Sequence, residues 1–191
     1  MELESSEWLS YPGSVDHSHI PIDLFGSKKH AGVPRGVLVF ADASSNIVFK
    51  VNNAHTHSSP KKLLLDSSAN PLFSIHRFPN GCWKCYKGDS NEEKELIFSV
   101  QRTLKKLSRV ELEVFFKGEN DGECDLKVRG SPFKRSCNIY KHNELVAQSS
   151  LMYKLHQIFV SRDKFRLTIF PETFDHALIV ALFVIFLNGR K

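Results

Sequence analysis

The last eighteen residues, Phe174 to Lys191, contain an unbroken apolar run from Ala177 to Leu187. As a helix, Phe174–Leu187 would be about 21 Å long at about 1.5 Å per residue. A bilayer core of about 30 Å needs roughly twenty apolar residues, and Asp175 and His176 interrupt the start of this segment. The helix would be apolar on every face, which is typical of a helix surrounded by protein or lipid. We therefore expect protein to surround it; a short tail anchor flanked by the basic C-terminus is the alternative.

The chain between residue 21 and the apolar run consists of short β-prone segments separated by Asp, Ser, Asn and Gly. In Glu111–Phe115, the apolar Leu112 and Val114 share one face of the predicted strand while two glutamates share the other. The expected strands are Gly36–Asp42, Ile47–Val51, Lys61–Leu65, Pro71–Arg77, Cys82–Lys87, Glu95–Thr103, Arg109–Phe116, Cys124–Arg129, Ser136–Tyr140, Leu145–Tyr153 and Lys164–Phe170.

About a dozen short strands at regular spacing indicate a sandwich or a closed barrel. A closed sheet with a wide lumen can surround a helix that is apolar on every side. The sequence therefore predicts an all-β fold with one helix: a closed antiparallel β-barrel of about twelve strands around a buried hydrophobic C-terminal α-helix.

Composition and the N-terminal sequence bound the compartment and the domain plan. The 191 residues carry a formal net charge of +5, and their four cysteines are too few for a disulfide scaffold. Residues 1–20 lack the basic and apolar regions of a secretory signal. We expect a polar, loosely ordered lead-in over residues 1–20 and one domain over residues 21–191. The expected location is intracellular: cytoplasmic, with peripheral membrane or nuclear association open.

A pattern spread over almost the whole chain is similar to the plant LURP-one-related proteins of the Tubby C-terminal-like superfamily. The order and spacing of its pieces carry this resemblance, which no single piece does alone. They are Phe40–Asp42 with Ile47–Val51, Leu63–Ser67 with Asn70–Leu72, Trp83, Tyr86–Gly88, Leu96–Val100, Glu111–Phe115, Cys124–Ser131, Arg135–Cys137, Val146–Ala147 and the apolar helix.

The resemblance implies a barrel around a central helix and no catalytic residue set. It also implies a relation to phospholipid scramblases and to Tubby-like, membrane-tethered transcription regulators, and it links some family members to plant defence. Tubby domains bind phosphoinositides through basic residues on the barrel exterior. That motif has no position-by-position match in this sequence, so no binding residue is carried over.

Two patterns resemble metal or redox sites. Cys82 and Cys85 have CxxC spacing, but in a strand residues three apart point to opposite faces, so the two sulfurs would diverge. Barrel-lining thiols with Trp83 in the core are the favoured interpretation.

His17-Ser-His19 and His55-Thr-His57 lie in polar, turn-rich stretches without carboxylates to complete a site, and we expect solvated loop histidines. No cofactor is expected, and nucleophile and phosphate-loop motifs are absent from the sequence.

The basic residues are the remaining candidates for function, and most are expected at strand ends or on outward-facing positions. If several converge on one barrel end, they would attract anionic lipid headgroups. The candidate contacts are Lys61, Lys62, Lys105, Lys106, Arg109, Lys134 and Arg135. The sequence shows no nucleic-acid-binding motif such as a helix-turn-helix.

The favoured hypothesis is a non-enzymatic, monomeric binding or adaptor module that acts at an anionic membrane surface. Two alternatives stay open. One is a scramblase-like, lipid-active protein whose hydrophobic helix leaves the barrel, and the other is a protein-interaction module in signalling. The protein partners are unknown from the sequence.

Overall fold

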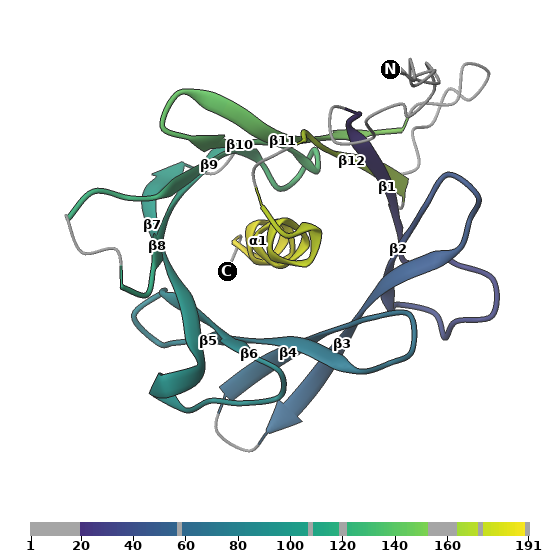
Figure 1. The fold of residues 1–191 in the computed structure, drawn as a ribbon, viewed down its shortest axis with the longest axis horizontal. Helices are drawn as coiled ribbons and strands as arrows, with labels where there is room; N and C mark the ends of the chain where they lie inside the picture. Colours follow the sequence, from purple (N-terminus) through teal and green to yellow (C-terminus); the bar gives the residue numbers. More distant parts are fainter. Residues whose placement is uncertain are drawn as a thin grey trace, which may run out of the picture.

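Twelve antiparallel strands form a closed barrel around one α-helix in the computed structural model (Figure 1). The structure describes residues 20–56, 59–106, 109–118, 122–152, 164–171 and 174–189. The strands are β1 (Ile22–Ser27), β2 (Leu38–Ala41), β3 (Ile47–Thr56), β4 (Ser59–Leu65), β5 (Pro71–Arg77), β6 (Trp83–Lys87), β7 (Leu96–Lys106), β8 (Arg109–Phe116), β9 (Leu126–Ser131), β10 (Ser136–Lys141), β11 (Glu144–Leu151) and β12 (Lys164–Ile169).

The helices are α1 (His176–Asn188) and the short 3₁₀ helix η2 (Glu93–Glu95). This architecture confirms the predicted closed barrel with a C-terminal helix. The predicted lead-in lies outside the described residues except for Ile20, and the domain bounds of 21–191 stay a prediction.

The barrel is an up-and-down meander, in which each strand pairs with its neighbours in the sequence and β1 pairs with β12 to close the ring. The closing strand, β1, is absent from the strands that the sequence pattern predicts. Its Gly26 explains why the pattern is weak: a Cβ there would lie 2.0 Å from Cζ of Phe165 on β12. The aromatic ring occupies the space of the missing side chain, so this strand pairs through its backbone while contributing little hydrophobic alternation.

Helix α1 lies in the lumen, where Figure 1 shows it nearly end-on inside the ring of strands. Asp175 caps its N-terminus by accepting a hydrogen bond from the Ala177 amide at 3.0 Å. Asp175 therefore starts the helix, which begins at His176. Ten consecutive residues, Ala177 to Phe186, are buried, as expected for a helix that the wall surrounds on every side.

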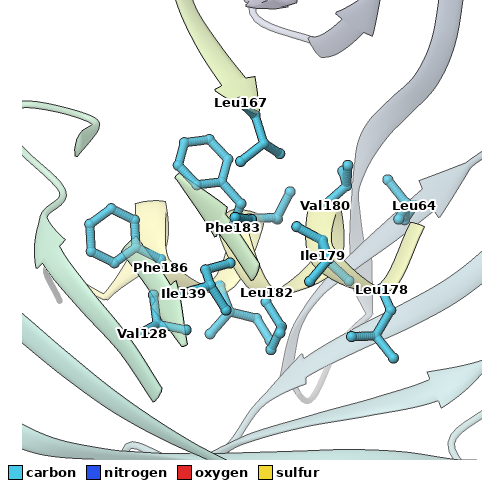
Figure 2. Packing of buried hydrophobic residues seen from close by; sticks show 14 of the residues in the cluster. Leu64, Val128, Ile139, Leu167, Leu178, Ile179, Val180, Leu182, Phe183 and Phe186 are labelled. Carbon is cyan, nitrogen blue, oxygen red and sulfur yellow. The ribbon is translucent and has the colours of Figure 1, made fainter. Parts of the chain in front are cut away.

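The wall meets the helix through the inward-facing residues of its strands. Figure 2 shows six helix side chains pointing into the space lined by wall residues from four different strands. The helix residues labelled there are Leu178, Ile179, Val180, Leu182, Phe183 and Phe186, and the wall residues are Leu64, Val128, Ile139 and Leu167.

Phe183 links the helix to the strand pair that closes the barrel. Its ring centroid lies 5.0 Å from that of Phe165 on β12 and 6.3 Å from that of Phe40 on β2. Phe186 lies 6.0 Å away on the same helix. Aromatic pairs at these separations stabilise a fold by more than their buried area alone would give. This cluster therefore holds α1 against β12 and β2, the two strands that flank β1.

Phe183→Ala is expected to lower the free energy of unfolding by about 3–5 kcal/mol, because the ring is fully buried and its removal leaves a cavity. Guanidinium denaturation followed by circular dichroism measures the change. Phe78→Ala is the matched control: Phe78 is 37% exposed in the β5–β6 connection, and its loss should cost less than about 1 kcal/mol. Equal losses for the two variants would contradict the packing described.

Candidate functional site: a basic barrel end with a pocket at its mouth

The meander assigns every connection to one of two barrel ends. Connections that follow odd-numbered strands lie at one end, and those that follow even-numbered strands, with the β12–α1 link, lie at the other. Helix α1 runs between the ends, so its C-terminus reaches the first one. Consistent with this, a Cβ added to Gly189 would lie 3.5 Å from Val110 Cγ1 at the start of β8. We call these the helix-C end and the helix-N end.

Basic residues gather at the helix-C end. The connections β1–β2, β3–β4, β5–β6, β7–β8 and β9–β10 contain no Asp or Glu, while most of the sixth, β11–β12, lies outside the described residues. The basic residues of these five connections and of the strand ends that border them are Lys28, Lys29, Arg35, Arg77, Lys105, Lys106, Arg109, Lys134 and Arg135.

Acidic residues gather at the helix-N end. Two of its turns, β2–β3 and β4–β5, are closed by an aspartate that accepts hydrogen bonds from an asparagine four residues later. These bonds hold the pKa of Asp42 and that of Asp66 below the usual value. The described acidic residues of this end are Asp42, Asp66, Asp89, Glu92, Glu93, Glu95, Glu123, Asp125, Glu144 and Asp175. The barrel therefore carries opposite charge at its two ends.

A pocket of about 240 Å³ opens at the mouth of the helix-C end, against the last turn of α1. Three cationic side chains line it: Lys28, Lys62 and Arg135. Its described lining contains no carboxylate. The apolar part of the lining includes Phe133 from the β9–β10 turn and Leu187 from the helix, so the pocket offers positive charge beside an apolar wall.

Strand register explains why Lys62 faces the pocket. It lies two residues before Leu64, which is fully buried in the lumen, and therefore on the same inward face of β4. Its cross-strand partner is Asn53, which lines the same pocket, and Lys62 Nζ donates to Asn53 Oδ1 at 2.5 Å. Lys62 thus departs from the outward placement that we expect for most basic residues.

Arg135 reaches the mouth from the turn between β9 and β10. Its guanidinium carbon lies 5.5 Å from the centroid of the Phe165 ring, and its carbonyl accepts a hydrogen bond of 3.0 Å from Ser149 Oγ. Ser149 also accepts from the Cys137 amide at 3.0 Å. This buried serine fixes the base of the turn from inside the barrel, which restricts where the guanidinium can lie.

The other predicted contacts are not among the residues that line the pocket. Lys61 points outward and forms an ion pair with Asp89, and only 12% of its side chain is exposed. Arg109 and Lys134 are exposed at the helix-C end, outside the lining of the pocket. Lys105 and Lys106 lie at the end of β7, with Lys106 opposite Arg109, and their side chains fall outside the description.

The sequence predicted Lys62 and Arg135 as contacts only within a longer set of basic residues. Lys28 belongs to a basic pair of the sequence but was not among the predicted contacts, and Phe133 was not predicted at all. Lys28 directly follows β1, the strand that the pattern did not reveal. Phe133 separates Pro132 from the Lys134–Arg135 pair, and an exposed aromatic residue beside two cations was the available signal. Whether the seven predicted residues contact lipid stays a prediction.

The cysteines and histidines do not assemble with these cations. Cys85 faces the lumen beside Trp83 in the core, as alternation predicts, and all four cysteines are free thiols. Within the described residues, no group of three His, Cys, Asp or Glu side chains is placed to hold a metal ion. His17, His19 and the side chains of His55 and His57 lie outside the description.

We expect Cys85 and Cys137 to resist alkylation by iodoacetamide at pH 8 in the native protein. The thiolate is the reactive form, and burial raises the pKa of Cys85 and raises that of Cys137 to about 12. Peptide mass spectrometry after a timed reaction measures the modification, with the guanidinium-unfolded protein as the reference. Modification of either residue at the unfolded rate would contradict the burial.

Comparisons with known proteins give the chain its family. The family model described as LURP-one-related matches residues 22–187. Protein LURP-one-related 7 of Arabidopsis thaliana is 49% identical over 187 residues, which cover 98% of this chain and 100% of that protein. Protein LURP-one-related 15 of the same plant is 30% identical over 172 residues, 86% of this chain and 78% of that protein.

A solved structure agrees with the fold. The X-ray structure of an Arabidopsis thaliana protein is 29% identical, with a TM-score of 0.67, and the likeness covers 89% of this chain and 91% of that one. In the described part of this chain, the one long helix is too short to count as a candidate membrane span. The family match spans β1 through α1, the whole of the barrel and its central helix, and the chain belongs to the LURP-one-related family.

Proposed function

We propose that this LURP-one-related protein is a non-enzymatic binding module that docks on anionic membrane surfaces through its helix-C end. The separation of charge between the two barrel ends carries the proposal. A peripheral protein needs a face on which cations act together. Five connections at this end hold no carboxylate, and nine Lys or Arg residues lie in them or at the strand ends that border them. The proposed location is the surface of an intracellular membrane.

Exposed apolar side chains at the same end support membrane docking. Phe133 is 46% exposed in the β9–β10 turn, Phe78 is 37% exposed in the β5–β6 connection, and Met152 is 40% exposed after β11. All three connections belong to the helix-C end. Apolar side chains of peripheral proteins bury at the boundary between headgroups and acyl chains, so these tips would enter the interface while the surrounding cations contact the headgroups.

The expected binding is weak and depends on salt. Each Lys or Arg near an anionic surface contributes about 1 kcal/mol, and charges farther than a Debye length of about 10 Å at 0.1 M salt contribute little. Five effective cations would give about 5 kcal/mol, which corresponds to a dissociation constant on the order of 0.1–1 mM. Such affinity suits reversible recruitment.

The barrel stays intact in this proposal, unlike in the scramblase-like alternative. For α1 to leave the lumen, ten consecutive buried side chains would have to separate from the wall. The lumen left behind would be a cavity far larger than a single core substitution creates, and such cavities are costly. The contacts of α1 therefore favour docking of the folded barrel by its end.

Sedimentation with vesicles of phosphatidylcholine, with and without 20% phosphatidylserine, tests the proposal. We expect recovery with the anionic vesicles only, and its loss in 0.5 M salt. The variant Arg109→Gln with Lys134→Gln should lower the partition coefficient about 30-fold, since two surface charges contribute about 2 kcal/mol.

The matched control is Lys87→Gln with Lys94→Gln, which removes the same charge from the helix-N end. This control should bind nearly as well as the unaltered protein, because its lost charges face away from the membrane. Equal recovery with neutral and anionic vesicles would refute membrane docking. Equal weakening of the two double variants would refute the orientation.

A further inference from the structure

The pocket at the mouth of the barrel needs its own explanation. A flat anionic surface attracts exposed cations, such as Arg109 and Lys134, without any concave site. Lys28, Lys62 and Arg135 instead line one pocket, although they come from the β1–β2 connection, β4 and the β9–β10 turn. Lys62 reaches it from the inward face of its strand. The meander has therefore brought three cations together over the end of the central helix.

The helix end accounts for only part of this positive charge. The C-terminus of a helix carries about half a negative charge, and nearby cations stabilise it. One lysine or arginine would satisfy that requirement. Asn188 already binds a carbonyl of the last turn, since its Nδ2 donates to Val184 O at 2.6 Å. Three cations exceed the charge of the helix terminus and suit an additional anion.

Neighbouring groups hold two of these cations in place. The Arg135 guanidinium lies over the Phe165 ring, and the Arg135 carbonyl is tied to Ser149. The Lys62 ammonium is bonded to Asn53, which also lines the pocket. Such constraints lower the entropy lost when a charged side chain binds a ligand, and they distinguish this pocket from a flat cluster of exposed cations.

The size and the lining of the pocket limit the class of ligand. Its volume of about 240 Å³ is below the roughly 300–1,000 Å³ of common small-molecule sites. A terminal phosphate carries about −1.5 to −2 charges near pH 7 and three acceptor oxygens, which matches three cationic donors. The apolar wall of Phe133, Leu187 and Leu38 would contact a small body that carries the phosphate.

We propose that this pocket binds a phosphomonoester on a small, glycerol-sized body. Two sources share that chemistry: the headgroup of phosphatidic acid in a membrane and a free glycerol phosphate. Lys28, Lys62 and Arg135 contact the phosphate, and the apolar wall contacts the carbon skeleton. The membrane form of the proposal rests on the proposed docking of the helix-C end, whereas the free form does not.

The experiment uses the full chain and two probes. Calorimetric titration with sn-glycerol 3-phosphate tests the free source. Sedimentation compares vesicles that contain phosphatidic acid with phosphatidylserine vesicles of matched surface potential, which tests the lipid source. The pocket variant is Lys62→Gln, because glutamine retains a donor for Asn53. The control is Arg109→Gln, which removes one charge from the same end outside the pocket lining.

With at least one probe, we expect saturable binding of glycerol phosphate, or preference for phosphatidic acid over phosphatidylserine, that Lys62→Gln weakens about tenfold or more. Arg109→Gln should leave the affinity for glycerol phosphate and the ratio of binding to the two kinds of vesicle nearly unchanged, because its loss weakens docking on both kinds of anionic vesicle alike. A charge-assisted contact of this kind is worth about a factor of ten in affinity. Thermal melting of both variants shows that the fold is retained, and Arg135→Gln provides a second pocket variant if Lys62→Gln melts early.

The outcomes separate the pocket from the docking proposal. Binding of glycerol phosphate alone assigns the free source, and preference for phosphatidic acid alone assigns the lipid source. No saturable glycerol phosphate binding together with equal recovery on the two kinds of anionic vesicle overturns the pocket while leaving membrane docking in place. A glycerol phosphate affinity, or a preference for phosphatidic acid, that both variants weaken equally overturns it as well.

Discussion

Contact between the side chains of α1 and the inner face of the sheet maintains both parts of this molecule. A ring of twelve strands has a lumen that must be filled, and a helix that is apolar all round must be covered. Eight of the ten buried helix residues are Leu, Ile, Val or Phe, and at about 1.5–3 kcal/mol each their burial contributes roughly 12–24 kcal/mol of gross hydrophobic stabilisation. This gross term is as large as the whole net stability of about 5–15 kcal/mol typical of a domain, so neither part is expected to persist without the other.

The same arrangement gives the protein two chemically different ends. Because the strands form a simple meander and α1 returns through the lumen, every other connection lies beside the helix C-terminus. The helix places its negative terminus where the basic connections gather, and Asp175 caps its positive terminus where the acidic ones gather. The charge separation thus agrees with the helix direction, and the pocket at the mouth forms where inward strand faces, one turn and the helix end meet.

The sequence was informative where a strand has one buried and one solvated face. The segments Pro71–Arg77 and Arg109–Phe116 match β5 and β8 at both ends, because alternation and flanking turns define them. The sequence pattern did not predict β1, where the Phe165 ring occupies the space that a side chain at Gly26 would need. The sequence predicted a basic barrel end only on the condition that several cations converge there. Which end each connection lies at is fixed only once the order of the strands in the closed ring is known. The inward direction of Lys62 depends on register, and the convergence with Lys28 depends on the missed strand.

Native-state hydrogen exchange of the α1 amides, with and without anionic vesicles, tests the central claim most directly. If the barrel wall shelters the helix permanently, the amides from Ile179 to Phe186 should exchange only through global unfolding, with the same protection when the protein is bound to vesicles. Exchange of these amides through a smaller opening, or a change in their protection on the membrane, would show that the helix leaves the lumen and would contradict docking of an intact barrel.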